Sequence, residues 1–228
     1  MLSEIAAATD RLTSGCASLT DDQARRPSLL PGWSRGHVLN HLALQAPALE
    51  RLLDWARTGT ETLQYPNRAE RDRAIEDGAA RPAAVLVEAV NTAAHQLRRA
   101  MEAMPQAAWR ATVRPITGEV CPAERVQLIR LRELEVHHVD LGLGYGFNDI
   151  PRPVLDLILA DVAGSLAQRA DMPDLLLRDP EGRTVHRFGA GGPTLTVSRA
   201  DALAWLSGRA VPPSFAHSAD LPRIPNWI

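Results

Sequence analysis

The sequence predicts a mainly α-helical protein, with a four-helix bundle over residues 1–150 and a small α+β domain over residues 151–228. Apolar residues recur at helical spacing through the first 150 residues, and breakers separate these runs. After residue 150, short strand-like runs flank a turn signal. The chain has 228 residues, of which 45% are hydrophobic, so it can bury cores for one large or two modest domains.

The first 60 residues predict three helical segments. Apolar residues spaced mostly three or four apart, with one gap of seven, indicate a helix at the start: Ile5, Leu12, Cys16 and Leu19. Thr20 and Gln23 have the spacing of a capping box for a short helix. Ser34 can cap a long helix that stops near Gly59, with Pro47 inside it as a possible kink. A polar loop carrying "YPNRAERDR" is expected next.

Two more helices complete the predicted bundle. One runs from about Pro82 to Met104, where apolar residues keep the helical period. The other follows Pro122 and contains "RLRELEVHHVD"; the glycines of "GLGYG" after it indicate a helix stop and turn rather than a nucleotide loop. Bundles of this kind build metal and ligand sites from side chains that face inward.

The C-terminal part has a different sequence pattern, with short strand-like runs as well as helical segments. A helix is predicted over residues 153–170, and a hairpin over "LLLRDPEGRTVHRF", where the turn falls on residues 179–182. "GAGGP" reads as a loop between strands, and "PTLTVS" as a further strand. "RADALAWLSGR" predicts a last helix that ends at Gly208. These elements predict a small α+β domain.

Composition narrows the class of function. The formal net charge of -2 gives no overall electrostatic field that would attract nucleic acid or an anionic membrane, so the expected partner is a small polar substrate or a protein. Every basic residue is Arg, which excludes a Schiff-base lysine and a P-loop lysine. With no apolar run of about 18 residues and an acidic start, we expect a soluble cytoplasmic protein. The oligomeric state stays open, and a monomer is consistent with the sequence.

The two cysteines do not indicate a disulfide framework or a structural zinc site. Cys16 and Cys121 lack the spacing that either would need, and reduced thiols are expected. Cys16 is in register with an apolar helix face, which favours core packing over a nucleophilic role. Cys121, beside Pro122, is expected to be a loop thiol.

"RLRELEVHHVDLGLGYG" combines ionisable and apolar residues on one predicted helix. Glu133 and His137 are four residues apart, so both side chains can reach one ion, and a carboxylate with imidazoles suits zinc or another divalent first-row metal. His37 and His41, also four apart, both offer a third ligand. Spacing alone leaves open a simple Glu–His surface pair, although the apolar surround makes an unpaired buried Glu133 costly.

Two neighbouring residues have open roles. His138 points about 100° away from His137 on a helix, and it is either a hydrogen-bond donor that supports the ligands or an interfacial residue. Asp140 can orient an imidazole or make a local turn bond.

Several segments resemble one known family. "LLPGWSRGHVLNHLA" and "RELEVHHVDLG" together resemble the mycothiol-dependent maleylpyruvate isomerases, a branch of the DinB-like metal-binding four-helix bundles. "LDWARTGTETLQYP" and the C-terminal module with "ALAWLSGR" are similar to the same family, so the resemblance spans nearly the whole chain.

The resemblance implies the site residues. Matched motif by motif, the zinc ligands are His41, Glu133 and His137, and it is the resemblance that selects His41 over His37. It also implies a sterol-carrier-like C-terminal domain with a functionally important arginine, for which "WLSGR" suggests Arg209 and Arg199 is the fallback. As further guanidinium groups for substrate carboxylates, the metal helix offers two lesser candidates, Arg130 and Arg132.

The implied activity is zinc-dependent cis-trans isomerisation of maleylpyruvate to fumarylpyruvate in gentisate-type aromatic breakdown, with mycothiol as cofactor. Reversible thiolate addition would remove the double bond long enough for rotation, and zinc favours the thiolate form. Two alternatives remain: another mycothiol-dependent S-transferase acting on a different electrophile, and a non-catalytic small-molecule binding protein.

Overall fold

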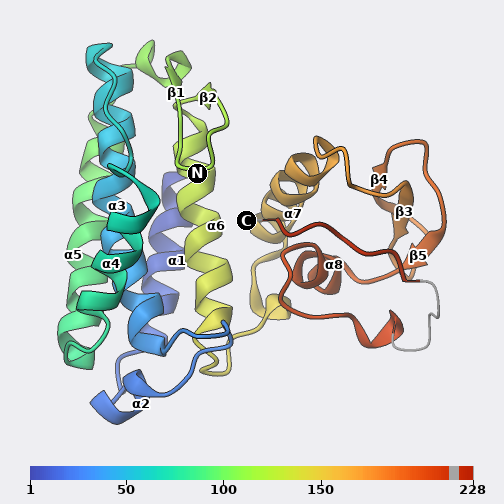
Figure 1. The fold of residues 1–228 in the computed structure, drawn as a ribbon, viewed down its shortest axis with the longest axis horizontal. Helices are drawn as coiled ribbons and strands as arrows, with labels where there is room; N and C mark the ends of the chain where they lie inside the picture. Colours follow the sequence, from blue (N-terminus) through green and yellow to red (C-terminus); the bar gives the residue numbers. More distant parts are fainter. Residues whose placement is uncertain (216–220, 228) are drawn as a thin grey trace. The chain divides into compact units, whose positions relative to one another are not determined.

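The computed structural model describes residues 1–215 and 221–227 (Figure 1). The chain forms two compact units, Met1–Tyr145 and Gly146–Ile228. The first is helical and the second combines helices with a small sheet, so the predicted fold class is confirmed. Among the described residues, no helix is long and apolar enough to cross a membrane.

Four long helices build the first unit: α1 (Leu2–Gly15), α3 (Arg35–Thr58), α5 (Ala83–Glu102) and α6 (Arg125–Asp140). Each packs against two others, in the cyclic order α1, α5, α3, α6. The short elements between them are α2 (Asp21–Arg25), α4 (Arg68–Gly78), η1 (Ala108–Arg110), β1 (Thr112–Val113) and β2 (Cys121–Pro122). Fully buried leucines of all four helices fill the core, including Leu12, Leu42, Leu86 and Leu131.

The helix signals in the sequence correspond to real caps. Thr20 forms the predicted capping box with Gln23 at the start of α2. Ser34 caps α3 and accepts a hydrogen bond from the backbone N–H of His37, while Gly59 ends the helix in the left-handed conformation with φ of 74°. Pro47 lies inside α3, which continues unbroken for 24 residues.

The prediction of a polar loop after α3 is wrong in part, because residues 68–78 form the helix α4. Asn67 caps this helix by accepting a hydrogen bond from the backbone N–H of Glu70 at 2.8 Å. Only Ile75 is buried among its residues, so the segment has almost no apolar periodicity to reveal a helix. The cap and the packing of α4 against α3 supply what the pattern lacks.

A close approach between α3 and the end of α4 depends on Gly36. A Cβ atom at this position would lie 2.1 Å from the carbonyl oxygen of Ala79, which is backbone and cannot easily move. We therefore expect Gly36→Ala to lower the free energy of unfolding by about 1–3 kcal/mol. Gly164→Ala, inside a helix with open space around it, should instead raise it by about 0.5–1 kcal/mol. Chemical denaturation of both variants checks this; equal effects would contradict the proposed close approach.

The second unit contains α7 (Arg152–Ala167), a three-stranded sheet and α8 (Arg199–Leu206), with short η2 (Phe147–Asp149) and η3 (Pro213–Phe215) turns. The strands are β3 (Leu175–Arg178), β4 (Thr184–Phe188) and β5 (Thr194–Thr196), in the order β4-β3-β5. β3 and β4 form the predicted antiparallel hairpin, with Gly182 at φ of 79° in its turn. β5 pairs in parallel with β3. Gly208, at φ of 75°, follows α8 as expected.

Candidate metal centre

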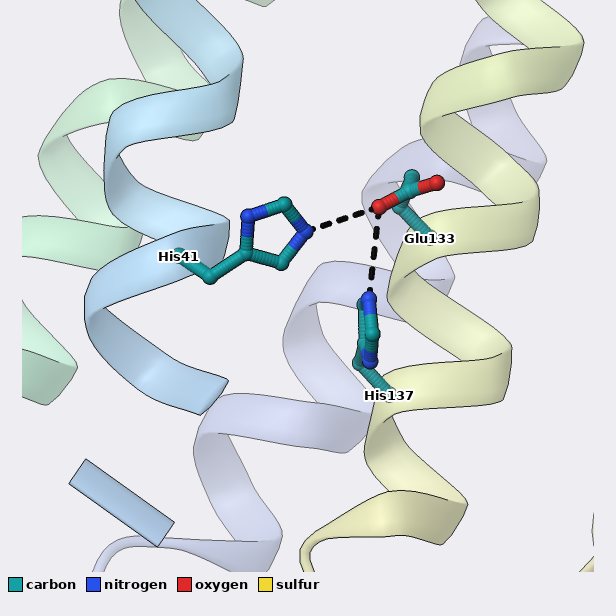
Figure 2. A group of neighbouring side chains, drawn as sticks. All are labelled: His41, Glu133 and His137. Carbon is teal, nitrogen blue, oxygen red and sulfur yellow. Dashed lines mark hydrogen bonds and ion pairs between the residues drawn. The ribbon is translucent and has the colours of Figure 1, made fainter. Parts of the chain in front are cut away.

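Three side chains from two helices of the bundle converge on one point (Figure 2). His41 comes from α3, and Glu133 and His137 come from adjacent turns of α6, which packs against α3. Glu133 Oε2 lies 2.9 Å from His41 Nε2 and 3.3 Å from His137 Nε2. Each residue offers one ligand atom, and these atoms all lie within 4.8 Å of one another. The cluster contains the three residues that the family resemblance selects.

The donor set fits a divalent first-row metal ion. Two imidazole nitrogens and one carboxylate oxygen are typical zinc ligands, and a tetrahedral zinc ion with bonds of about 2.1 Å holds its donors about 3.4 Å apart. The separations of 2.9 and 3.3 Å from Glu133 Oε2 are close to this value. Three protein donors leave a fourth position for another molecule, as catalytic sites require.

Burial and mutual contacts set the charge state of the cluster. Burial lowers the pKa of His41 to about 4, despite its hydrogen bond to Glu133. Burial alone would raise the pKa of Glu133, but His137 and His41 together hold it well below its usual range. Burial also acts to lower the pKa of His137, yet Asp140 and Glu133 raise it overall. At neutral pH, His41 is therefore a neutral imidazole and Glu133 a carboxylate, the charge states in which these side chains bind metal ions.

Two neighbours fix the orientation of the donors. Asp140 Oδ2 lies 2.8 Å from His137 Nδ1, so a neutral imidazole donates to Asp140 from Nδ1 and keeps its lone pair on Nε2. This contact shows that Asp140 orients an imidazole, one of the two roles that the sequence left open. On the other side, Arg132 Nη2 lies 3.6 Å from Glu133 Oε1, the oxygen that does not contact the histidines.

The structure separates His41 from His37. His37 Nδ1 lies 2.7 Å from Ser34 Oγ, and its Nε2 lies 2.9 Å from Glu76 Oε2, so both ring nitrogens are engaged at the start of α3. Trp33 packs against both histidines, with ring centroids 5.6 Å from His41 and 6.1 Å from His37. Trp33 therefore braces the helix that carries His41.

Two residues near the cluster were not singled out in the sequence. Arg71 of α4 interacts electrostatically with His41, and Tyr65 does so with Glu133. The Tyr65 ring has the guanidinium groups of Arg51 and Arg71 each 6.0 Å from its centre. Burial raises the pKa of the Tyr65 hydroxyl to about 12, so it stays a hydrogen-bond donor at neutral pH. No periodicity marks these residues, and it is the fold of α4 and of the segment before it that brings them near the cluster.

His138 belongs to a separate cluster on the side of α6 that faces α1. Its ring stacks on Tyr145 with centroids 3.8 Å apart, and the Tyr145 hydroxyl donates to Glu135 at 2.6 Å. Glu135 also pairs with Arg11 of α1. The stacked ring supports Tyr145, which binds Glu135, and the Glu135–Arg11 pair ties α6 to α1. These contacts favour the interfacial role of His138 over support of the metal ligands.

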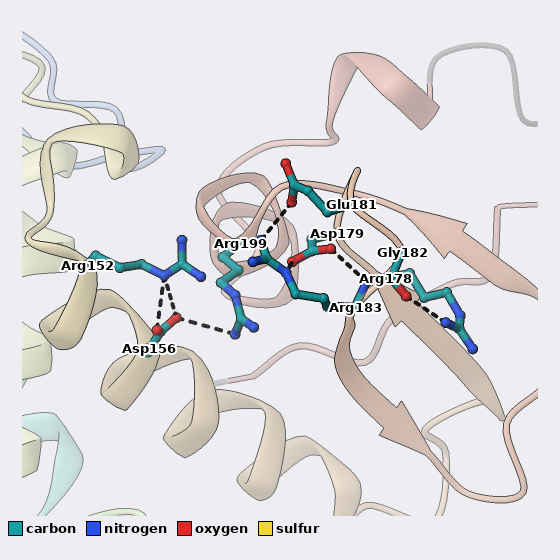
Figure 3. A network of polar contacts seen from close by, with 8 residues as sticks. All are labelled: Arg152, Asp156, Arg178, Asp179, Glu181, Gly182, Arg183 and Arg199. Carbon is teal, nitrogen blue, oxygen red and sulfur yellow. Dashed lines mark hydrogen bonds and ion pairs between the residues drawn. The ribbon is translucent and has the colours of Figure 1, made fainter.

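The second unit places its two candidate arginines differently. Arg199 Nη1 lies 3.3 Å from Asp156 Oδ1, and Asp156 also binds Arg152, which links α8 to α7 (Figure 3). Arg209 follows α8 and donates from Nη1 to the carbonyl oxygen of Ser207 at 2.7 Å. Arg199 therefore has a structural partner inside its own unit that accounts for its charge.

Neither cysteine is placed to act as a nucleophile. Cys16 and Cys121 are both buried, and Cys121 lies in β2 rather than in the expected loop, opposite Val113 of β1. Burial raises the pKa of the Cys16 thiol to about 11. We expect no reaction with Ellman's reagent at neutral pH until guanidinium chloride unfolds the chain, when both thiols should react. Rapid labelling of the native protein would contradict this, and would allow a protein thiol in the chemistry.

Known proteins match the chain along its whole length. The family model described as the mycothiol maleylpyruvate isomerase N-terminal domain matches residues 5–142. A crystal structure of a mycothiol-dependent maleylpyruvate isomerase superimposes with a TM-score of 0.86 at 26% identity, covering 99% of this chain and 95% of that one. A histidine-to-alanine mutant of such an enzyme has the same identity and coverage, with a TM-score of 0.85. A search of curated protein sequences gave no match. The chain belongs to the mycothiol maleylpyruvate isomerase family.

Proposed function

We propose that this protein converts maleylpyruvate to fumarylpyruvate with mycothiol as its thiol cofactor, and that His41, Glu133 and His137 hold a zinc ion. The observation that carries this proposal is the convergence of three donor atoms within 4.8 Å on α3 and α6, in a chain that belongs to this family. When bound there, zinc supplies a Lewis acid that lowers the pKa of a thiol at the open coordination position.

The reaction requires a temporary loss of double-bond character. The thiolate sulfur forms a bond to one carbon of the cis double bond, and the electron pair moves through the conjugated system to the carbonyl oxygen. Rotation about the resulting single bond, followed by expulsion of the thiolate, gives the trans product with the thiol returned. A nucleophile from the protein is not needed, which agrees with the burial of both cysteines.

The chain's own residues provide the charge that this reaction needs. Maleylpyruvate is a dianion and its adduct carries further negative charge, so cationic groups near the reacting atoms stabilise both. Arg132 lies beside Glu133, and Arg71 interacts with His41. The protonated hydroxyl of Tyr65 is a hydrogen-bond donor in the same neighbourhood. We propose that these three groups stabilise the negative charge that develops on the substrate.

Arg209 is our proposal for the functional arginine of the second unit, because "WLSGR" matches the family motif, and Arg199, which pairs with Asp156, is the fallback. Arg209→Ala should raise the KM for maleylpyruvate, since a guanidinium clamps carboxylates well. Arg199→Ala serves as the comparison: it should lower the melting temperature with a smaller effect on KM. The reverse pattern would move the assignment to Arg199.

The amount of thiol consumed per product distinguishes the isomerase from the alternatives. An isomerase forms fumarylpyruvate with catalytic amounts of mycothiol and leaves the thiol concentration unchanged, whereas an S-transferase consumes one thiol for each product. A non-catalytic binding protein forms no product and keeps its ligand when Glu133→Ala removes the metal site. Product and free thiol measured in the same reaction distinguish all three, and stoichiometric loss of thiol would overturn the isomerase proposal.

A further inference from the structure

A cavity lies in the bundle on the side opposite the metal cluster. It has a volume of about 190 Å³ and is lined mainly by residues of α1 and α5. The cluster lies where α3 packs against α6, and none of its three residues lines this cavity. In the cyclic order of the four helices, the α1–α5 contact is the one that faces the α3–α6 contact across the core.

Arg130 of α6 reaches this cavity from inside the bundle. Its side chain is fully buried, and Nη1 donates to the carbonyl oxygen of Leu42 at 2.9 Å and to Gln45 Oε1 at 2.8 Å. Within residues 1–215 and 221–227, its buried Nε and Nη2 atoms have no hydrogen-bond partner. The same residue lines the cavity. Two donors of a buried guanidinium are thus left for a group that the described residues do not provide.

The charge on Arg130 persists despite its burial. Burial lowers its pKa to about 10, so the guanidinium is still protonated at neutral pH. The charge of Glu133 acts on it, but that carboxylate already contacts His41, His137 and Arg132. A buried, incompletely paired charge is costly, and a carboxylate that accepts from Nε and Nη2 would offset this cost.

The walls of the cavity define the rest of the ligand. Apolar side chains from both helices line it, including Ile5, Ala6, Ala94 and Leu97. An apolar cavity of about 150 Å³ accommodates benzene, so the volume here fits a single ring with one small substituent. Asp10 and Arg98 also line the cavity, and Arg98 pairs with Glu102, so Arg98 offers no unpaired charge to a second carboxylate, which Asp10 disfavours. We propose that this cavity binds a compact monocarboxylate with an apolar body, such as an aromatic acid, with its carboxylate on Arg130.

Benzoate is the probe that tests this site, with benzamide as its uncharged analogue of the same shape. Isothermal titration of the full-length, metal-loaded protein should show one benzoate bound per chain, and benzamide should bind at least about tenfold more weakly because it cannot form the charge-assisted pair. Absence of benzoate binding, or equal binding of benzamide, would overturn the proposal.

Variants that fill the cavity without touching Arg130 locate the binding. Ala94→Phe from α5 and Ala6→Phe from α1 should each weaken benzoate binding at least about tenfold. Ala84→Phe, on an exposed position of α5 outside the cavity, should leave it unchanged. Removing the charge with Arg130→Met should also abolish binding, with a thermal melt to show that the variant folds.

Binding at the metal cluster is the competing result, since a carboxylate can also bind a metal ion. Glu133→Gln distinguishes the two sites. The proposal expects Glu133→Gln to bind benzoate at least as tightly as the wild type, because the variant removes a negative charge that acts on Arg130, whether or not the protein proves to be an isomerase. Loss of binding in Glu133→Gln with retention in Ala94→Phe would place benzoate on the metal and contradict the proposal.

Discussion

Glu133→Gln is expected to remove both metal binding and thiol-dependent turnover while leaving the bundle folded. Glutamine keeps the shape of the side chain but replaces an anionic oxygen with a neutral amide, and Glu133 is the residue that contacts both histidines of the cluster. Its pKa, held well below the usual range, means that the charge is present at any neutral assay pH. Metal content by elemental analysis and the turnover rate measure the two losses.

Glu135→Gln is the matched control, because it makes the same change two residues away on α6. Glu135 pairs with Arg11 and accepts from Tyr145, on the side of the helix that faces α1. This variant should be less stable, since the part-buried guanidinium of Arg11 loses its ion pair, but should keep its metal. Wild-type metal content in Glu133→Gln would contradict the assignment of the cluster, and metal loss in both variants would point to a general effect on folding.

Asp140→Asn should weaken metal affinity by about 10–100-fold without removing any ligand. Asp140 is fully buried and accepts from His137 Nδ1 at 2.8 Å. The Asp140 carboxylate fixes the tautomer of the His137 imidazole and raises the basicity of its Nε2 atom. Asparagine lacks the negative charge on which both effects depend. Competition with a chelator of known affinity measures the change.

His37→Gln separates this effect from a loss of helix capping. His37 lies four residues before His41 and interacts with Ser34 and Glu76 rather than with the cluster. The variant should lose some stability at the start of α3 and keep wild-type metal affinity. If His37→Gln weakens metal affinity as much as Asp140→Asn does, His37 is itself part of the metal site.

Local signals in the sequence predicted most of the fold. The caps at Thr20 and Ser34, and the glycine stops at Gly59 and Gly208, act through contacts within a few residues, so the pattern contains them directly. The segment of α4 was missed because its stability depends on one buried side chain, Ile75, and on packing against α3. That packing is a tertiary effect that periodicity cannot show.

The candidate site was predicted in the same uneven way. The spacing of Glu133 and His137 indicated a possible ligand pair, but the choice of His41 over His37 came from the family resemblance and not from spacing. The structure gives the physical difference, since His37 is engaged at the N-terminus of α3 while His41 reaches Glu133 one turn further along. Arg71 and Tyr65 could not be predicted, because the segment after α3 that brings them to the cluster has almost no apolar periodicity.

The most direct test of the proposed function is turnover of maleylpyruvate by the zinc-loaded protein, measured with and without mycothiol and repeated after chelation and re-addition of zinc. We predict that fumarylpyruvate forms only when both zinc and mycothiol are present, that chelation stops the reaction, and that zinc restores it. Isomerisation that continues without thiol or after chelation would contradict the proposal, as would the absence of any turnover by the fully loaded protein.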